Sequence, residues 1–292
     1  NNIRSWFRQT KSHNTMILSD KETEDNDKPN AKRYGDEDIK NTLGKLIRKG
    51  ETNQYQFVAT ENQGYANFTH RRSIFFVTPK EKPFFVIVDE GIGNATGFSK
   101  LYFHLCDDKT AESVSLDIEN HGAHTTFSDN NNLFIRSFGN ADITQNEVKG
   151  YISYDTKGLF LPRKAYSLVM DKKENSPVRY ITVIYPIANE TPEISARFTD
   201  DETFIEDAIK LEVTVNGQRY EYHTRLGSSI DQYPVGKEYP GYYDPENPKD
   251  VTETLKDITG GGSHFLSLIC FIIGGVAILL GLVRVWSVIT LL

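Results

Sequence analysis

Three consecutive side chains, those of His70, Arg71 and Arg72, have types suited to acid–base and anion-binding chemistry. An imidazole titrates near neutral pH, and a guanidinium can bind a carboxylate or sulfate through two parallel hydrogen bonds. The three lead into an apolar run that predicts a strand, on which Arg71 and Arg72 point to opposite faces. At most one arginine can therefore face an anionic ligand. The alternative is a charged strand edge held by structural salt bridges.

A second, looser basic group lies in the middle of the chain. Arg163 and Lys164 are adjacent, and Lys149 and Lys157 precede them closely. Such a group can bind an anionic polymer, although a solvated loop would have the same composition. The run HGAH at residues 121–124 is more typical of a turn than of a binding site.

Short runs of β-branched and aromatic residues dominate residues 73–222 and predict strands. Residues 78–83, TPKEKP, have the composition of a hairpin turn. A second hairpin is indicated near the end of this region, where apolar residues alternate with polar ones from Ile209 to Val215 before the turn pair Asn216-Gly217. The other predicted strands cover residues 74–77, 84–88, 100–105, 114–118, 133–138, 151–154, 166–170 and 180–185. The pattern predicts a mostly β protein with an antiparallel β-sandwich.

Two segments depart from the strand pattern. Residues 20–50 are highly charged, and we expect a surface insertion in which Asp36 caps a short helix with Ile39, Leu43, Leu46 and Ile47 on its apolar face. Residues 227–263 are rich in Pro, Gly, Tyr and acidic residues and end in three glycines, as in a linker. We therefore expect a sandwich domain at 1–226, a linker at 227–263 and a hydrophobic helix at 264–292.

The apolar run at residues 265–283 has no charged side chain. A helix of about 20 apolar residues spans a bilayer, so we predict a C-terminal transmembrane helix. Arg284 directly after the run favours a cytoplasmic C-terminus and places the sandwich outside. The alternative is a hydrophobic tail helix that packs against protein.

The charge of the chain excludes one class of partner. With 33 basic and 40 acidic residues the formal net charge is −7. An acidic protein does not attract polyanions over long distances, so we expect no nucleic-acid partner, and an acidic sugar would need a local basic patch. The chain begins with neither Met nor a signal-peptide pattern. We therefore expect it to begin inside a longer protein.

Three stretches in order carry a family resemblance. They are WFRQTKSHNT at 6–15, HRRSIFFV at 70–77 leading into 84–90, and VRYITVIYP at 178–186; GYISY at 150–154 and Pro162-Arg163 fit the same pattern. In order and spacing they resemble the heparinase II/III family of polysaccharide lyases, and most of all its heparan sulfate lyases. The resemblance covers residues 4–226.

The resemblance implies a C-terminal β-sandwich that follows an α/α toroid, with the active site between the two. Such lyases cleave uronic-acid-containing polysaccharides by β-elimination, which needs no water and no redox cofactor. The substrate carboxylate must be neutralised, a base must remove the C5 proton, and an acid must protonate the leaving oxygen. The toroid's Tyr and Asn and a His-x-His segment would lie upstream of residue 1. We therefore expect this chain alone to be inactive.

The resemblance also assigns roles to residues present here. His13 matches a family His that, in some members, joins upstream residues around a structural metal, so a zinc or calcium ion in the full-length parent is expected to need further ligands. We predict His70 as a catalytic residue, His13 as a metal ligand, and Arg71, Arg72, Arg163 and Lys164 as substrate-binding residues.

Two functional hypotheses follow. The first is the C-terminal portion of a periplasmic or extracellular lyase that degrades glycosaminoglycans such as heparan sulfate. The second is a membrane-tethered sandwich that binds acidic glycans without catalysis.

Overall fold

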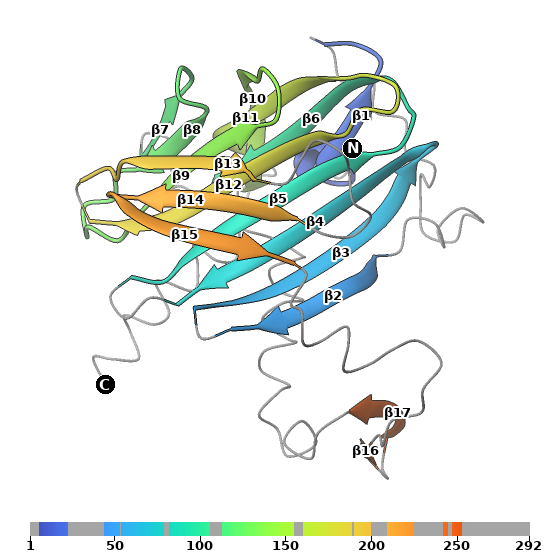
Figure 1. The fold of residues 1–292 in the computed structure, drawn as a ribbon. Coiled ribbons are helices and arrows are strands. Elements are labelled where there is room, and N and C mark those ends of the chain that lie inside the picture. Colours follow the sequence, from blue (N-terminus) through green and yellow to red (C-terminus); the bar gives the residue numbers. More distant parts are fainter. Residues whose placement is uncertain are drawn as a thin grey trace. The chain divides into compact units, whose positions relative to one another are not determined.

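Antiparallel strands make up nearly all the regular structure in the part of the chain that the structure describes (Figure 1). The computed structural model describes residues 6–22, 44–52, 54–78, 82–105, 113–154, 160–188, 190–199, 209–224, 242–244 and 247–252. The chain divides into two compact units, Asn1–Arg225 and Leu226–Leu292. A 3₁₀ turn, η1 (Thr10–Ser12), precedes the first strand. The predicted mostly β, antiparallel fold is confirmed.

The first unit contains three sheets. Sheet A has the order β1-β6-β11-β10, with β1 (Met16–Ser19), β6 (Gly97–His104), β11 (Phe160–Lys172) and β10 (Thr144–Tyr154). Sheet B has the order β2-β3-β4-β5-β12-β9-β8-β7, with β2 (Lys45–Glu51), β3 (Tyr55–Tyr65), β4 (Phe68–Val77), β5 (Phe84–Ile92), β12 (Val178–Ile187), β9 (Asn132–Gly139), β8 (Gly122–Thr125) and β7 (Val114–Asp117). Sheet C has the order β13-β14-β15, with β13 (Ile194–Phe198), β14 (Lys210–Val215) and β15 (Gln218–His223).

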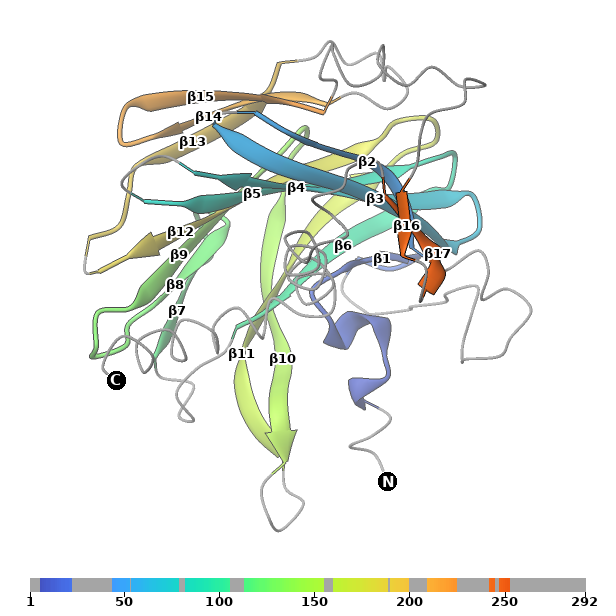
Figure 2. The ribbon, with the colours of Figure 1, turned by 90° about the horizontal axis from the view of Figure 1, so that it is seen from below.

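Sheet B is the middle layer, with sheet A on one side and sheet C on the other (Figure 2). Toward sheet A, the hydroxyl of Tyr180 on β12 donates to the carbonyl of Ser99 on β6 at 3.1 Å. Toward sheet C, the ring of Tyr222 packs against Tyr55 and Phe75, with ring centroids 5.2 and 5.4 Å apart. Because both faces of sheet B are covered, its central strands are apolar runs rather than alternating ones.

Sheet C is a third layer that the sequence did not predict, although its β14–β15 hairpin was predicted correctly. Leu211, Val213 and Val215 are buried along β14. Asn216 and Gly217 form the turn with φ values of 49° and 79°, the left-handed region that a two-residue hairpin of this type requires. The alternation of β14 therefore places its apolar face on sheet B.

Two predictions need correction, and a third concerns residues outside the described part of the chain. The helix expected to include Leu46 and Ile47 is wrong for that part, because residues 45–51 form β2 and pair with β3 at the edge of sheet B. The run at 121–124 is a turn only at its start, because Gly122–Thr125 is β8. The predicted membrane span at 265–283 lies outside the described residues, and no helix among those that are described is long and apolar enough to cross a membrane.

The second unit contains one described hairpin. β16 (Tyr242–Asp244) pairs with β17 (Asn247–Thr252), within the segment for which a linker was predicted.

Candidate functional site

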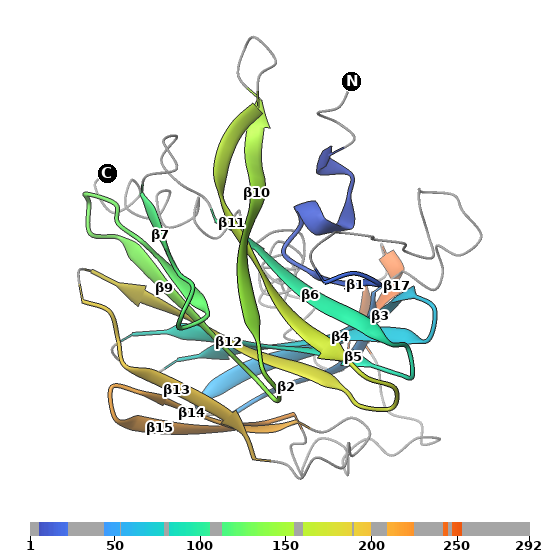
Figure 3. The same ribbon diagram turned by 90° about the horizontal axis from the view of Figure 1, so that it is seen from above.

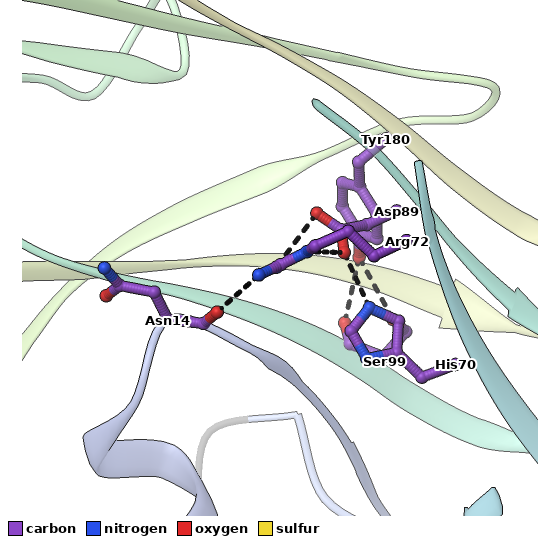
Figure 4. Close-up of polar contacts among 6 residues, drawn as sticks. All are labelled: Asn14, His70, Arg72, Asp89, Ser99 and Tyr180. Carbon is purple, nitrogen blue, oxygen red and sulfur yellow. Dashed lines mark hydrogen bonds and ion pairs between the residues drawn. The ribbon is translucent and has the colours of Figure 1, made fainter. Parts of the chain in front are cut away.

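His70 and Arg72 meet at one buried carboxylate, that of Asp89 (Figure 4). Strand register places Arg72 directly opposite Asp89, and His70 lies two residues away on the same face of β4. The Asp89 Oδ1 atom accepts hydrogen bonds from His70 Nε2 at 2.6 Å and Arg72 Nε at 2.7 Å. Arg72 Nη2 donates to Asp89 Oδ2 at 3.1 Å. The three side chains form one ion cluster between sheets A and B.

Burial and charge act against each other at Asp89, whose exposed fraction is 0%. Burial alone would raise the pKa of Asp89, but the charge of Arg72 and the hydrogen bonds from His70 and Arg72 outweigh it and hold this pKa below its usual value. The carboxylate therefore stays ionised. His70, with an exposed fraction of 6%, directs a ring nitrogen at Asp89 and not at solvent. This is the geometry of a buried structural hydrogen bond, and a catalytic role for His70 stays a prediction.

We call residues 6–15 the N-terminal segment. The ion cluster binds this segment through Arg72. Arg72 Nη1 donates to the main-chain carbonyl of Asn14 at 2.8 Å. The Asn14 side chain in turn accepts the main-chain N–H of His104 at 2.7 Å. One residue further on, the carbonyl of Thr15 accepts the N–H of Tyr102 at 3.0 Å. Asn14 therefore ties the segment to both sheets of the sandwich.

Two consecutive acidic side chains on β5 point to opposite faces of sheet B. Asp89 faces sheet A, and Glu90 next to it accepts a hydrogen bond from Arg179 Nε at 3.0 Å on the other face. The guanidinium of Arg179 lies 3.8 Å above the centre of the Phe198 ring, which belongs to sheet C. Arg71 also points away from His70 and pairs with Glu61 at 3.2 Å. The sequence prediction that Arg71 and Arg72 diverge agrees with this placement.

A second group of side chains, the aromatic–cationic corner, consists of Trp6, His104, Tyr151 and Arg163. The Trp6 ring packs edge-to-face on Tyr151 at 4.9 Å and on His104 at 5.8 Å. His104 Nε2 lies 2.8 Å from the carbonyl of Lys11. Sequence reasoning identified Arg163 but missed the other three. Their signal was present in part, because Trp6 opens the first family motif and His104 ends an apolar run.

His104 is buried, and two basic residues affect its pKa. The pKa of His104 is lowered to about 4, chiefly by burial and further by the charges of Arg163 and His13, although the hydrogen bond to the Lys11 carbonyl acts to raise it. His104 is therefore neutral at pH 7, and its Nδ1 atom has no hydrogen-bond partner among the described residues. His13 and Arg163, 150 residues apart in sequence, thus act on the same imidazole.

The remaining predicted cation, Lys164, is already paired. Its Nζ donates to Glu147 at 2.9 Å, and both side chains are partly exposed. Surface pairs of this kind stabilise by at most about 1 kcal/mol, so Lys164 can exchange this partner for another anion.

The described residues do not by themselves provide a metal site. His13 is exposed, and no group of three or more His, Cys, Asp and Glu side chains converges within the described ranges. Structural zinc needs three or four ligands. His13 as a ligand in the full-length protein stays a prediction that requires residues from outside this part.

Comparison with known proteins identifies the family. The family described as "Heparinase II/III-like, C-terminal" matches residues 1–196. This chain belongs to that family. The resemblance found in the three sequence motifs is thereby confirmed. A domain of unknown function, DUF3592, matches residues 195–252, a range that begins within β13 of sheet C.

Individual members of the heparinase II/III family are also similar to this chain. The heparin-sulfate lyase of Bacteroides thetaiotaomicron is 40% identical over 222 residues, which are 75% of this chain and 28% of that protein. The heparin-sulfate lyase of Bacteroides stercoris is 32% identical over 76% of this chain and 30% of its own length. A crystal structure of heparinase III, 38% identical, matches with a TM-score of 0.64 over 77% of this chain and 31% of that one. This chain spans less than a third of these relatives.

Proposed function

We propose that this chain is the C-terminal portion of a polysaccharide lyase that cleaves heparan sulfate-like glycosaminoglycans by β-elimination. The observation that carries the proposal is the 40% identity over 222 residues to a protein named heparin-sulfate lyase. In the complete enzyme, an α/α toroid precedes the sandwich and supplies the proton-transfer groups. The sandwich supplies one wall of the glycan cleft.

The chemistry divides between the two parts. β-Elimination needs a neutralised carboxylate, a base at C5 and an acid at the leaving oxygen. The described part of the chain offers cations, Arg163 and Lys164, that can contact the substrate carboxylate or sulfate. Its buried imidazoles are otherwise engaged, since His70 binds Asp89 and His104 Nε2 faces the Lys11 carbonyl. We therefore expect this chain alone to bind glycan weakly and to cleave nothing.

The test joins the 292-residue chain to the N-terminal part of the Bacteroides thetaiotaomicron relative. The unsaturated uronate formed by β-elimination absorbs ultraviolet light, which gives a direct assay on heparan sulfate, chondroitin and alginate. We expect product from heparan sulfate with the joined protein and with neither part alone. A joined protein with a native circular dichroism spectrum but no product from any of the three polymers would refute the proposal.

The same experiment decides the second hypothesis, a membrane-tethered glycan-binding sandwich. Micromolar binding of heparan sulfate by the chain alone, together with an inactive joined protein, would favour that hypothesis. In both cases we propose a periplasmic or extracellular sandwich, and protease accessibility of the sandwich in intact cells tests the location.

A further inference from the structure

The N-terminal segment, in dark blue, leaves sheet A at the start of β1 and projects from the sandwich (Figure 3). Burial of its side chains contributes little to its position. Among residues 6–15, Ser12 alone is buried, and the two aromatic rings, Trp6 and Phe7, are only partly buried. The segment is therefore held mainly by hydrogen bonds, and the bonds that reach the sheets determine where it lies.

The segment is folded on itself before it reaches the sheets. The Ser12 hydroxyl can donate to the carbonyl of Trp6 at 2.7 Å or to that of Gln9 at 2.5 Å. In the short turn η1, the N–H of His13 donates to the carbonyl of Thr10 at 3.1 Å. These local bonds make the segment a compact element, so a bond near its end restrains the whole.

Four hydrogen bonds join the segment to the two sheets. Arg72 Nη1 donates to the Asn14 carbonyl at 2.8 Å. The N–H groups of His104 and Tyr102 donate to the Asn14 side chain at 2.7 Å and to the carbonyl of the next residue at 3.0 Å. The His104 ring lies 2.8 Å from the Lys11 carbonyl. Three of the four come from β6, which neighbours β1, and the one from Arg72 comes from sheet B. Arg72 therefore fixes the segment across the sandwich.

Asp89 determines the direction of the bond from Arg72. This fully buried carboxylate accepts hydrogen bonds from two of the three guanidinium nitrogens, Nε at 2.7 Å and Nη2 at 3.1 Å. Because the guanidinium is planar, these two contacts orient Nη1 toward Asn14 (Figure 4). His70 lies 2.6 Å from the same carboxylate and restrains it. A lysine at position 72 would retain the charge, but one nitrogen cannot reproduce contacts made by three.

We propose that Arg72 is a positioning residue for the lyase reaction: oriented by Asp89, it fixes the N-terminal segment as a rigid connection between the sandwich and the upstream toroid. This inference rests on the proposed function, in which the two parts supply the two walls of the glycan cleft. Because the toroid joins the sandwich through this segment, the angle between the walls depends on the bond from Arg72 to Asn14. In this role Arg72 acts through the segment, in contrast to the direct substrate contact predicted from the sequence.

Amide hydrogen exchange of the full 292-residue chain, followed by NMR, tests the attachment. The N–H groups of Tyr102 and His104 donate to the segment, so their exchange rates report whether it is held. Hydrogen bonds to charged groups contribute enough that Arg72→Lys should raise both rates about tenfold or more. Arg179→Lys is the matched control, because it alters a buried ion pair with Glu90 on the other face of sheet B, and it should leave both rates unchanged.

Substitutions at Asn14 test the attachment from the segment and leave the ion cluster intact. Asn14→Ala removes the oxygen that accepts the His104 N–H and should raise its exchange rate by a similar factor. Asn14→Asp retains an acceptor oxygen and should keep the wild-type rate. Unchanged rates in Arg72→Lys, or equal rises in Arg179→Lys, would overturn the inference whether or not the joined protein is active.

Kinetics of the joined protein test the role in the reaction. A changed angle between the walls weakens the contacts of a glycan that lies between them, so KM for heparan sulfate should rise about tenfold in Arg72→Lys and in Asn14→Ala. A residue that only stabilises the fold would lower the amount of active enzyme and leave KM unchanged. Asn14→Asp and Arg179→Lys should have the wild-type kcat and KM.

The outcomes separate this inference from the proposed function. If the joined protein is active and Arg72→Lys has the wild-type KM, the proposed function stands and the positioning role is wrong. If the joined protein with wild-type residues forms no product, the proposed function fails and the role of Arg72 in the reaction fails with it.

Discussion

Replacing Asp89 by Asn tests the ion cluster most directly. Asp89 is 0% exposed, and its two oxygens accept hydrogen bonds at 2.6, 2.7 and 3.1 Å from His70 and Arg72. Removing one partner of a buried ion pair costs about 3–5 kcal/mol, because the other charge stays buried without compensation. The Arg72 side chain is 16% exposed and can turn partly to water, so we expect the lower end, about 3 kcal/mol.

Urea unfolding followed by fluorescence measures this loss. With an m-value of about 2–3 kcal/mol/M, the midpoint should fall by roughly 1–1.5 M. Asp171→Asn is the matched control, because Asp171 is an exposed carboxylate on β11 and its loss should change stability by less than about 0.5 kcal/mol. A loss below about 1 kcal/mol for Asp89→Asn, or an equal loss for the control, would refute the structural role of the cluster.

The pH dependence has a definite sign. Because the folded-state pKa of Asp89 is lowered, its contribution is fully present above the unfolded value, about pH 4, and disappears as the pH falls through the lower folded value. The part of the stability difference between wild type and Asp89→Asn that comes from the Asp89 charge should therefore shrink as the pH falls below about 4.

Three further predictions concern other buried positions. Lys172→Met leaves three main-chain carbonyls without the ammonium that donates to them at 2.6, 2.8 and 3.1 Å, and should lower stability by about 1–3 kcal/mol in urea unfolding. Gly122→Ala drives a Cβ atom into the carbonyl of Ile135 and should cost about 1–3 kcal/mol by the same assay, whereas Gly44→Ala, with nothing within 4 Å, should be neutral. Because the folded pKa of His104 is lowered to about 4, the unfolding free energy of wild type should fall by roughly 3 kcal/mol as the pH falls from about 6.5 toward 4. His104→Gln should lack this dependence when urea midpoints are compared across this pH range.

Local signals explain what the sequence predicted correctly. The alternation of β14 and the Asn216-Gly217 turn are properties of a dozen neighbouring residues, so the hairpin could be predicted without tertiary information. Residues 46 and 47 show the opposite case. Their spacing suits a helix, but pairing with β3 provides more stabilisation than local propensity and makes them part of β2.

The third layer could not be predicted because its determinants are distant in sequence. Tyr222 packs against Tyr55, and nothing in the sequence near either residue indicates the other. A partial signal was available in β5 and β12, whose uninterrupted apolar runs are typical of strands covered on both faces.

The candidate sites also combine features that local sequence predicts with contacts that depend on the tertiary structure. Alternation along β4 predicted that Arg71 and Arg72 diverge, but the partner of Arg72 depends on the β4–β5 register. An Asp inside an apolar strand does indicate a buried cation nearby. The aromatic–cationic corner joins Trp6 to Tyr151, and no local pattern predicts such a contact.

The aromatic contacts of sheet C determine where this protein can be shortened. The family match ends at residue 196, but β14 and β15 follow it and cover Tyr55, Phe75 and Phe84, all at most 3% exposed. A polypeptide that ends at residue 196 would expose these rings to water as a hydrophobic patch, and such patches promote self-association. Truncated versions that stay soluble should therefore extend through residue 224, beyond the point where the family match would end the domain.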